Sequence, residues 1–393
     1  MGQIEHKRKI AFIANTMCVG GVERALLELL KNLDYDRFDV TLYLRNPDGE
    51  LFSEIDKRVD VKYWGTVTHE DRLVCLMKKF RLISVMKGIW YRFLARLHSN
   101  DWALNELFAV QSIPRDAHEN YDCIIAYHGA TVGVLAVALY RLKGTKRIAW
   151  IHGRDPFPEA DSHIFEKQYQ KFDCIFCVSQ SIKQIFADRY PSASDKSNVN
   201  YNLIDKERIA ELSAFEHSPF KSTALLTVGR LASVKGQQMI PETARMLVDA
   251  GYDIHWYLVG DGPLRKEVER EIEKHGVSDR VILLGTQSNP YPYIKNCDIY
   301  VQPSFSEGYC TTTMEAKILQ KPIVTTDAPG MREQFVSGEN GLIVDAMTPE
   351  ALFDGIKTLI DHPEMREKFV ENLKNEGYDN SKELQKLYDF IES

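Results

Sequence analysis

Short apolar runs of strand length recur along the first half of the chain, and each is followed by a stretch with helix-like spacing. The runs lie at residues 10–14, 38–43, 123–127, 147–151 and 174–178. Apolar runs that alternate with helices are typical of a parallel sheet that is buried on both faces. This alternation therefore predicts an α/β fold.

The same alternation restarts after an irregular segment at residues 200–222. A second set of apolar runs lies at residues 224–228, 255–259, 281–284, 299–301, 322–325 and 341–344. A chain of 393 residues is too long for one ordinary core. We therefore expect two α/β domains, at residues 1–202 and 203–380, and a final helix at residues 381–393 that could cross back onto the first domain.

The composition favours an ordered globular protein and argues against a nucleic-acid-binding one. It is 44% hydrophobic and 27% charged, as in ordered globular proteins, and the net charge of −7 argues against a general affinity for nucleic acid. Seven cysteines, mostly inside apolar runs, suit reduced thiols, and no signal-peptide pattern or long apolar span is present, so we expect a cytoplasmic protein. Cys174 and Cys177 have metal-ligand spacing, but they lie in a strand-like run without a second pair, so we expect no metal site.

Residues 72–97 depart from the alternating pattern. Their apolar side chains form one helical stripe, and Lys78, Arg81, Arg92 and Arg96 fall roughly opposite it. A basic amphipathic helix of this kind can lie on anionic lipid, which would place the protein at the inner face of the plasma membrane. The alternative is an ordinary helical part of the first domain with a solvated basic face.

Two glycines, Gly20 and Gly21, stand where the first predicted strand passes into a helix. Glycines at such a junction allow backbone N–H groups to approach an anion closely, and the helix dipole favours negative charge there. The string lacks the third glycine of a dinucleotide fingerprint and the spacing of a P-loop, so a simple tight turn is the alternative interpretation.

The second domain begins in a similar way, with Arg230 directly after a predicted strand and Lys235 five residues later. Ligands of open α/β sheets bind at the carboxyl ends of the strands. An arginine and a lysine at that edge could neutralise a leaving nucleoside diphosphate. Two solvated surface cations are the alternative.

Two glutamates, Glu307 and Glu315, follow a later strand with seven residues between them. Glu307 is predicted on a loop, and a helix is predicted to begin near Thr311 and Thr312, where free N–H groups can receive phosphate oxygens. Glu315 can accept hydrogen bonds from sugar hydroxyls or can simply complement the helix dipole. In the first domain, His152 stands at a strand end, where an imidazole can bind a hydroxyl or a phosphate, although a structural role is the alternative.

As an ordered set, these strings resemble the retaining glycosyltransferases of family 4. That family has the GT-B fold, in which two Rossmann-like domains face each other across a central cleft. The resemblance covers nearly the whole chain. It rests on Gly20-Gly21-Val22-Glu23-Arg24, Trp150-Ile151-His152-Gly153, Val228-Gly229-Arg230 with Lys235-Gly236, Val259-Gly260-Asp261-Gly262-Pro263, and Pro303-Ser304 before Glu307-x7-Glu315.

The resemblance implies a role for each matched residue. In the second domain, Arg230 and Lys235 would bind the diphosphate, and the backbone amides at the predicted helix start would contact phosphate. Glu307 would lie at the donor sugar and Glu315 at the ribose of the nucleotide. The implied catalytic set is His152, Arg230, Lys235 and Glu307. The implied donor-binding set is Gly20, Gly21, Arg230, Lys235, Glu307, Thr311, Thr312 and Glu315. Many relatives carry Asp after the histidine, whereas this chain carries Gly153, which puts any His–Asp arrangement in doubt.

The resemblance also implies the substrates. The donor would be a nucleotide-diphosphate sugar, the acceptor a glycan or a lipid-linked molecule, and neither a cofactor nor a metal would be needed. Two alternatives remain open. The chain could be a GT-B-fold epimerase or phosphorylase, which the Glu307-x7-Glu315 spacing does not support, or a non-catalytic partner subunit, against which the intact set of charged residues argues.

Overall fold

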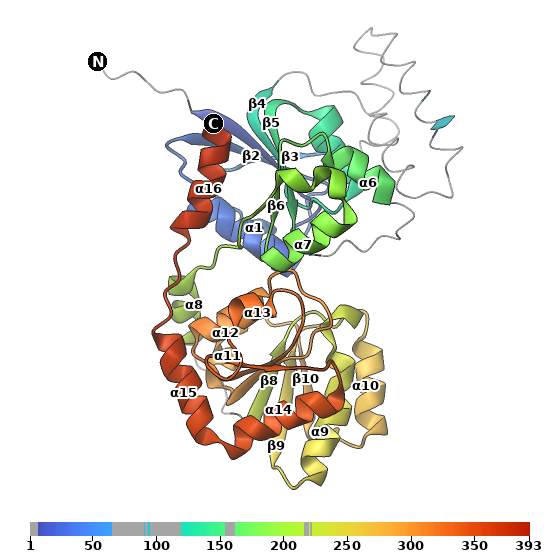
Figure 1. Cartoon of the computed structure of the whole chain (residues 1–393), viewed down its shortest axis with the longest axis vertical. Helices are drawn as coiled ribbons and strands as arrows, with labels where there is room; N and C mark the ends of the chain where they lie inside the picture. Colours follow the sequence, from blue (N-terminus) through green and yellow to red (C-terminus); the bar gives the residue numbers. More distant parts are fainter. Residues whose placement is uncertain are drawn as a thin grey trace. The chain divides into compact units, whose positions relative to one another are not determined.

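The computed structural model describes residues 7–64, 90, 93–94, 119–153, 162–215, 220 and 222–393. The chain divides into two compact units (Figure 1). Unit 1 comprises Met1–Leu203 with Ser381–Ser393, and unit 2 comprises Ile204–Asn380. The chain thus leaves unit 1 after Leu203 and returns to it for the last helix.

The described part of unit 1 holds one parallel sheet of seven strands, in the order β3-β2-β1-β4-β5-β6-β7. Its strands are β1 (Arg8–Ile13), β2 (Phe38–Leu44), β3 (Asp60–Tyr63), β4 (Asn120–Ala126), β5 (Lys143–Ile151), β6 (Cys174–Cys177) and β7 (Ser197–Val199). Its described helices include α1 (Gly21–Asn32), α5 (Val132–Ala136), α6 (Ser162–Tyr169), α7 (Gln180–Arg189) and α16 (Ser381–Glu392). The strand order reverses between β1 and β4, and such switch points are where doubly wound sheets bind ligands.

The last helix, α16, packs onto unit 1 through one buried face. Leu387, Tyr388 and Ile391 are buried there, and the Tyr388 ring lies 5.1 Å from that of Phe38. Lys146 Nζ donates to the carbonyl oxygen of Phe390 at 2.8 Å. The helix is therefore an integral part of unit 1, although it follows unit 2 in the sequence.

Unit 2 holds a second parallel sheet, in the order β10-β9-β8-β11-β12-β13. Its strands are β8 (Thr223–Val228), β9 (Ile254–Val259), β10 (Val281–Gly285), β11 (Ile299–Gln302), β12 (Ile323–Thr326) and β13 (Leu342–Val344). Its described helices are α8 (Lys206–Ser213), α9 (Ile240–Asp249), α10 (Arg265–Lys274), α11 (Tyr291–Asn296), α12 (Thr311–Ile318), α13 (Met331–Gln334), α14 (Pro349–Asp361) and α15 (Pro363–Lys374). Here the order reverses between β8 and β11.

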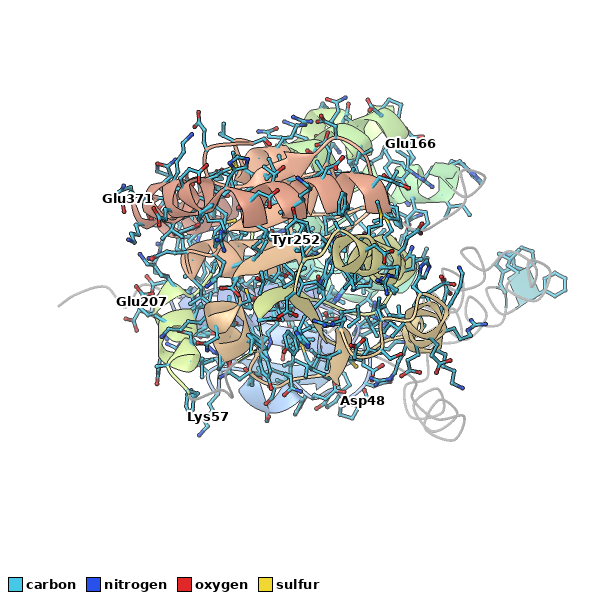
Figure 2. All side chains as sticks on the ribbon, turned by 90° about the horizontal axis from the view of Figure 1, so that it is seen from below. Asp48, Lys57, Glu166, Glu207, Tyr252 and Glu371 are labelled. Carbon is cyan, nitrogen blue, oxygen red and sulfur yellow. The ribbon has the colours of Figure 1, made fainter. Side chains whose placement is uncertain are left out.

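Apolar side chains fill both faces of this second sheet. Along β8, Leu225 belongs to one core cluster, whereas Leu226 and Val228 belong to the cluster on the other face. Successive strand side chains point to opposite faces, so a strand covered on both sides is apolar along most of its length. Charged side chains such as those of Glu371 and Glu207 extend outward from the covering helices (Figure 2).

The alternating pattern predicted the buried strands to within a few residues, but it missed β3 and β7. Both are outermost strands of the first sheet, with only a few residues each. β3 has no fully buried residue, and β7 reads Ser-Asn-Val. An edge strand is covered less completely than a central strand, so its sequence need not form an apolar run.

The expected basic helix at residues 72–97 lies almost entirely outside the described residues. Only Trp90, Phe93 and Leu94 are described there. The rings of Trp90 and Phe93 lie 5.9 Å apart, and the two residues are 59% and 52% exposed.

Candidate active site

The switch point of unit 2 brings two predicted cations to the carboxyl end of β8. Arg230 follows the strand directly and is exposed, and its backbone oxygen accepts a hydrogen bond from Gln237 Nε2 at 3.0 Å. Lys235 ends a short 3₁₀ turn (Ser233–Lys235). The next residue, Gly236, has φ +68°, and a Cβ there would lie 1.9 Å from the oxygen of Pro303. Only glycine therefore allows this turn to approach the loop after β11.

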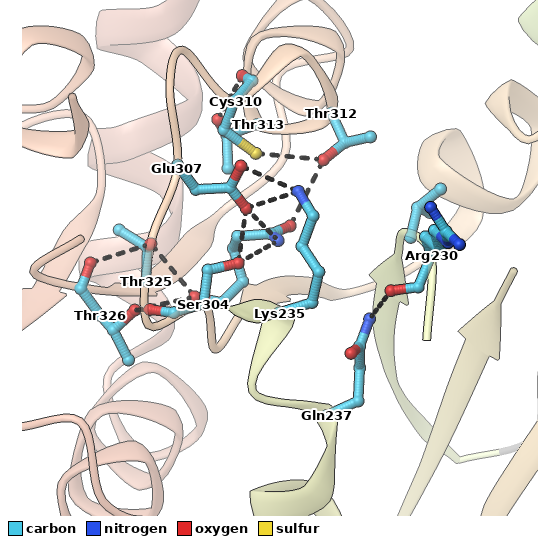
Figure 3. Close-up of polar contacts among 12 residues, drawn as sticks. Arg230, Lys235, Gln237, Ser304, Glu307, Cys310, Thr312, Thr313, Thr325 and Thr326 are labelled. Carbon is cyan, nitrogen blue, oxygen red and sulfur yellow. Dashed lines mark hydrogen bonds and ion pairs between the residues drawn. The ribbon is translucent and has the colours of Figure 1, made fainter. Parts of the chain in front are cut away.

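That approach places Lys235 against Glu307 (Figure 3). Lys235 Nζ lies 2.7 Å from Glu307 Oε1 and 2.8 Å from Oε2. Glu307 is 8% exposed, so the carboxylate is largely removed from water. A carboxylate so placed needs a charge partner and hydrogen bonds, because an unpaired buried charge is costly.

Two side chains near the end of β11 complete the environment of Glu307. Ser304 Oγ donates to Glu307 Oε1 at 2.6 Å, and Gln302 Nε2 lies 3.3 Å from the same oxygen. Gln302 Oε1 in turn accepts from Thr312 Oγ1 at 3.3 Å. Gln302 and Ser304 are fully buried, so this hydrogen-bond network fixes the Glu307 rotamer.

The charge state of Lys235 follows from two opposing effects. Burial disfavours the ammonium, but the Glu307 carboxylate outweighs it, and the pKa of Lys235 is raised above its usual value. Because a raised lysine pKa keeps the group protonated at neutral pH, Lys235 carries a positive charge at the switch point. With Arg230 nearby on the same strand end, the site is suited to an anion.

Helix α12 begins beside this pair, as predicted. The side chain of its N-cap residue, Cys310, contacts the Thr312 hydroxyl at 3.3 Å but caps no backbone amide, so the amides of Thr311 and Thr312 remain available to a ligand. Burial raises the pKa of the Cys310 thiol to about 11, so it stays protonated at neutral pH. The helix start can therefore bind an anion through its amides without competition from a thiolate.

Glu315 lies in the second turn of α12. It is half-buried, and Tyr291 Oη lies 3.5 Å from Glu315 Oε1. The carboxylate thus faces α11 on the site side of the helix, at a distance along the helix from the first amides. This separation is compatible with contacts to two different parts of one ligand.

At the switch point of unit 1, Gly20 is the N-cap of α1 and Gly21 is its first residue. No side chain caps this helix. Glu23, in the first turn, has Oε1 3.3 Å from His128 Nε2, and the backbone N–H of Asn15 donates to His128 Nδ1 at 3.3 Å. His128, which follows β4, therefore links the end of β1 to the glycine turn.

His152 follows β5, as predicted, and both of its ring nitrogens are buried, with no hydrogen bond of ordinary geometry to them in the described part of the chain. Burial, reinforced by the nearby His128, holds the pKa of His152 well below its usual range, so the ring is neutral. It packs against the ring of Tyr127 at 4.4 Å. Unpaired buried nitrogens are costly to a fold, and they suit a ligand hydroxyl.

The predicted residues are divided between the two units. Unit 1 holds Gly20, Gly21 and His152, and unit 2 holds Arg230, Lys235, Glu307, Thr311, Thr312 and Glu315. Among the described residues, no cluster of His, Cys, Asp and Glu could hold a metal ion, and Cys174 and Cys177 lie in β6 with thiol pKa values raised by burial. No helix in the described ranges is long and apolar enough to cross a membrane.

Comparison with known families decides the identity of this arrangement. Residues 19–208 match the family described as Glycosyltransferase Family 4, and residues 209–376 match Glycosyl transferases group 1. The chain belongs to glycosyltransferase family 4. It has the GT-B fold, since it is similar to the HepE protein of Anabaena, solved with UDP and glucose, at a TM-score of 0.73 and 19% identity over 98% of this chain and 100% of that one.

Two relatives of this family 4 protein are glycosyltransferases whose names state the glycan on which they act or in whose synthesis they take part. One is the N-acetylgalactosamine-N,N'-diacetylbacillosaminyl-diphospho-undecaprenol 4-alpha-N-acetylgalactosaminyltransferase of Campylobacter jejuni, 28% identical over 52% of this chain. The other is the lipopolysaccharide core biosynthesis glycosyltransferase LpsE of Rhizobium meliloti, 24% identical over 52% of this chain. The matches span 56% and 58% of the lengths of these enzymes.

Sequence reasoning assigned Glu307 and Lys235 to separate ligand contacts and did not foresee that they pair with each other. It also missed Gln302 and Ser304. The available signal was the string Gln302-Pro303-Ser304, which places polar side chains at the end of a central apolar strand. Polar residues in such a place require partners, and in this family 4 protein the partner is the Glu307 carboxylate.

This pairing predicts the effect of Glu307→Ala on stability. Removal of the carboxylate leaves Lys235 and Ser304 without their partner, so the free energy of unfolding should fall by about 1–3 kcal/mol. The double variant Glu307→Ala/Lys235→Met should lose less than the sum of the two single changes, because the partners are coupled. Urea unfolding measures both quantities.

Lys274→Ala is the matched control, since its ammonium pairs with Glu271 at 2.7 Å on an exposed helix surface. Its unfolding midpoint should equal that of the wild type. A Glu307→Ala variant as stable as the wild type would show that the pair in unit 2 contributes nothing to the fold.

Proposed function

We propose that this protein transfers a sugar from a nucleoside diphosphate sugar to a glycan or lipid-linked acceptor, with retention of configuration at the anomeric carbon. The observation that carries the proposal is the Lys235–Glu307 pair at the switch point of unit 2, next to the uncapped start of α12. A fixed cation and free helix amides at one place form a site suited to a diphosphate.

In this proposal, the residues of unit 2 divide the donor between them. Arg230 and Lys235 neutralise the charge that develops on the leaving diphosphate, and the amides of Thr311 and Thr312 bind phosphate oxygens. Glu315 accepts hydrogen bonds from the ribose. Glu307 lies at the donor sugar and also keeps Lys235 in place, so one carboxylate serves both groups.

Three residues of unit 1 also have proposed roles. Gly20 and Gly21, at the start of α1, border the diphosphate and the transferred sugar. The neutral ring of His152 hydrogen-bonds to a sugar hydroxyl, because its two unpartnered nitrogens can donate and accept. Retention of the anomeric configuration is proposed because the chain belongs to family 4. It is not inferred from any distance in the structure.

The names of two relatives support a proposal for the kind of acceptor. The Campylobacter relative is named for a diphospho-undecaprenol-linked glycan, and the Rhizobium relative for lipopolysaccharide core biosynthesis. We propose an acceptor of the same general class for this chain, in the synthesis of a cell-surface polysaccharide or glycolipid. Since Arg230 and Lys235 supply the positive charge, we propose that turnover needs neither a metal nor another cofactor. Because the net charge of the chain is −7, we also propose that nucleic acid is not a partner.

An acceptor-dependence assay tests the proposed reaction. The wild type should release nucleoside diphosphate from its donor sugar only when the acceptor is present. Arg230→Ala should raise the barrier by about 2–4 kcal/mol, seen as a lower kcat, because it removes an electrostatic contact to the leaving group. Arg270→Ala, on an exposed face of α10, is the control and should turn over like the wild type.

Each other outcome of this assay contradicts the proposal in a recognisable way. Release without acceptor and without a new glycosidic product indicates a GT-B epimerase or a hydrolase. No release with any donor indicates a non-catalytic partner subunit. Full turnover of Arg230→Ala would remove the assigned role of that side chain.

We also propose that residues 72–97 hold the protein on an anionic membrane surface, at the inner face of the plasma membrane. The support is the amphipathic, basic sequence pattern of this segment together with the exposed Trp90 and Phe93, since aromatic and cationic side chains are typical of interfacial helices. The acceptor class proposed above would be found at the same surface.

Vesicle sedimentation at low salt tests this placement. Changing Lys78, Arg81, Arg92 and Arg96 to Gln should weaken binding to anionic vesicles by about 1 kcal/mol for each cation near the surface. Nucleoside diphosphate binding is the control and should not change. A wild type that ignores anionic vesicles would show that the segment is an ordinary helical part of unit 1.

A further inference from the structure

The face of α12 that is turned away from the proposed donor site carries an unusual buried lysine. Lys317 is 4% exposed, and Thr313, one turn before it, is fully buried. Thr312 and Glu315 lie on the site side and are half-buried. The helix is thus polar on the side turned to the protein interior as well as on the side turned to the site.

Three groups surround the ammonium of Lys317. Nζ lies 2.8 Å from Glu376 Oε2, donates to the backbone oxygen of Gln334, and sits 5.1 Å from the centre of the Phe335 ring. Burial lowers the pKa of Lys317, and the Glu376 carboxylate opposes that effect. The lysine therefore depends on Glu376 for its charge compensation.

A second set of contacts connects this lysine to the start of the helix. Thr313 Oγ1 lies 2.8 Å from the backbone oxygen of Cys310 and 2.6 Å from Gln334 Oε1. Gln334 Nε2 donates to the same Cys310 oxygen at 3.3 Å. Gln334 thus contacts Lys317 through its backbone and the N-cap residue of α12 through its side chain.

Glu376 belongs to a different part of unit 2. It lies just after α15, and Asn340 Nδ2, from the loop before β13, donates to its other carboxylate oxygen. Four separate segments meet in this network. They are the segment after α15, the loop before β13, α13 and α12.

Stability alone is a weak explanation for such an arrangement. A well-packed apolar side chain in place of a buried ion pair is often neutral or stabilising. What the ion pair and its hydrogen bonds add is a specific position, because they are directional and apolar contacts are not. The α12 helix has only eight residues, and a fixed position matters for it because its first turn is the proposed phosphate site.

We propose that Lys317 and Glu376 are positioning residues that fix α12, and with it the amides of Thr311 and Thr312 that receive the diphosphate. This inference rests on the proposed function, since it concerns the same donor site. Neither side chain touches the ligand. Loss of either one leaves the helix free to shift, and a small displacement lengthens every amide–phosphate hydrogen bond at once.

Calorimetric binding of nucleoside diphosphates tests the proposal. The wild type is titrated with the diphosphates of uridine, guanosine, adenosine, cytidine and thymidine, and the tightest is used for the variants. Lys317→Met and Glu376→Gln should each bind it about tenfold or more weakly. Lys357→Met is the matched control, because its ammonium pairs with Asp361 at 2.8 Å on the surface of α14, and its affinity should equal that of the wild type.

The outcomes separate this inference from the proposed function. If the wild type binds none of the diphosphates, the proposed function fails. The positioning role is wrong if the wild type binds a diphosphate and both variants, measured at temperatures where they are folded, bind it with the same affinity. This holds even if the variants unfold at a lower temperature than the wild type. If Lys317→Met does not fold, Glu376→Gln decides the question, because it keeps the size of the side chain on a partly exposed residue.

Discussion

The ion pair between Lys235 and Glu307 is the contact on which the candidate site depends. It joins the turn after β8 to the loop after β11. These two strands lie on either side of the switch point in unit 2. Gly236 permits the approach, and Ser304 and Gln302 fix the carboxylate. The pair therefore holds a cation, a loop and the start of α12 in one arrangement before any ligand arrives, which is the preorganisation that charge stabilisation requires.

The same physical design occurs in both units. In each sheet the strand order reverses at one place, and a helix without a side-chain cap begins there, α1 in unit 1 and α12 in unit 2. The difference lies in charge. Unit 2 adds Arg230 and Lys235, whereas unit 1 adds the neutral His152, so the proposed diphosphate belongs mainly to unit 2 and hydroxyl recognition to unit 1.

Much of this could be predicted from the sequence, and the exceptions have physical causes. A buried central strand is apolar along most of its length, so β8 and β11 were found, while the edge strands β3 and β7 carry no such pattern. The helix start at Thr311 followed from local spacing. The pairings of Lys235 with Glu307 and of Lys317 with Glu376 join segments far apart in the chain, and a single sequence holds no signal for contacts of that kind.

The structure of a complex with the bound nucleoside diphosphate is the decisive measurement for this site. A phosphate oxygen should lie within hydrogen-bond distance of Lys235 Nζ and of the amides of Thr311 and Thr312, while Glu307 still contacts the ammonium. A diphosphate bound away from β8 and α12, with the Lys235–Glu307 pair unchanged and remote from it, would contradict the account.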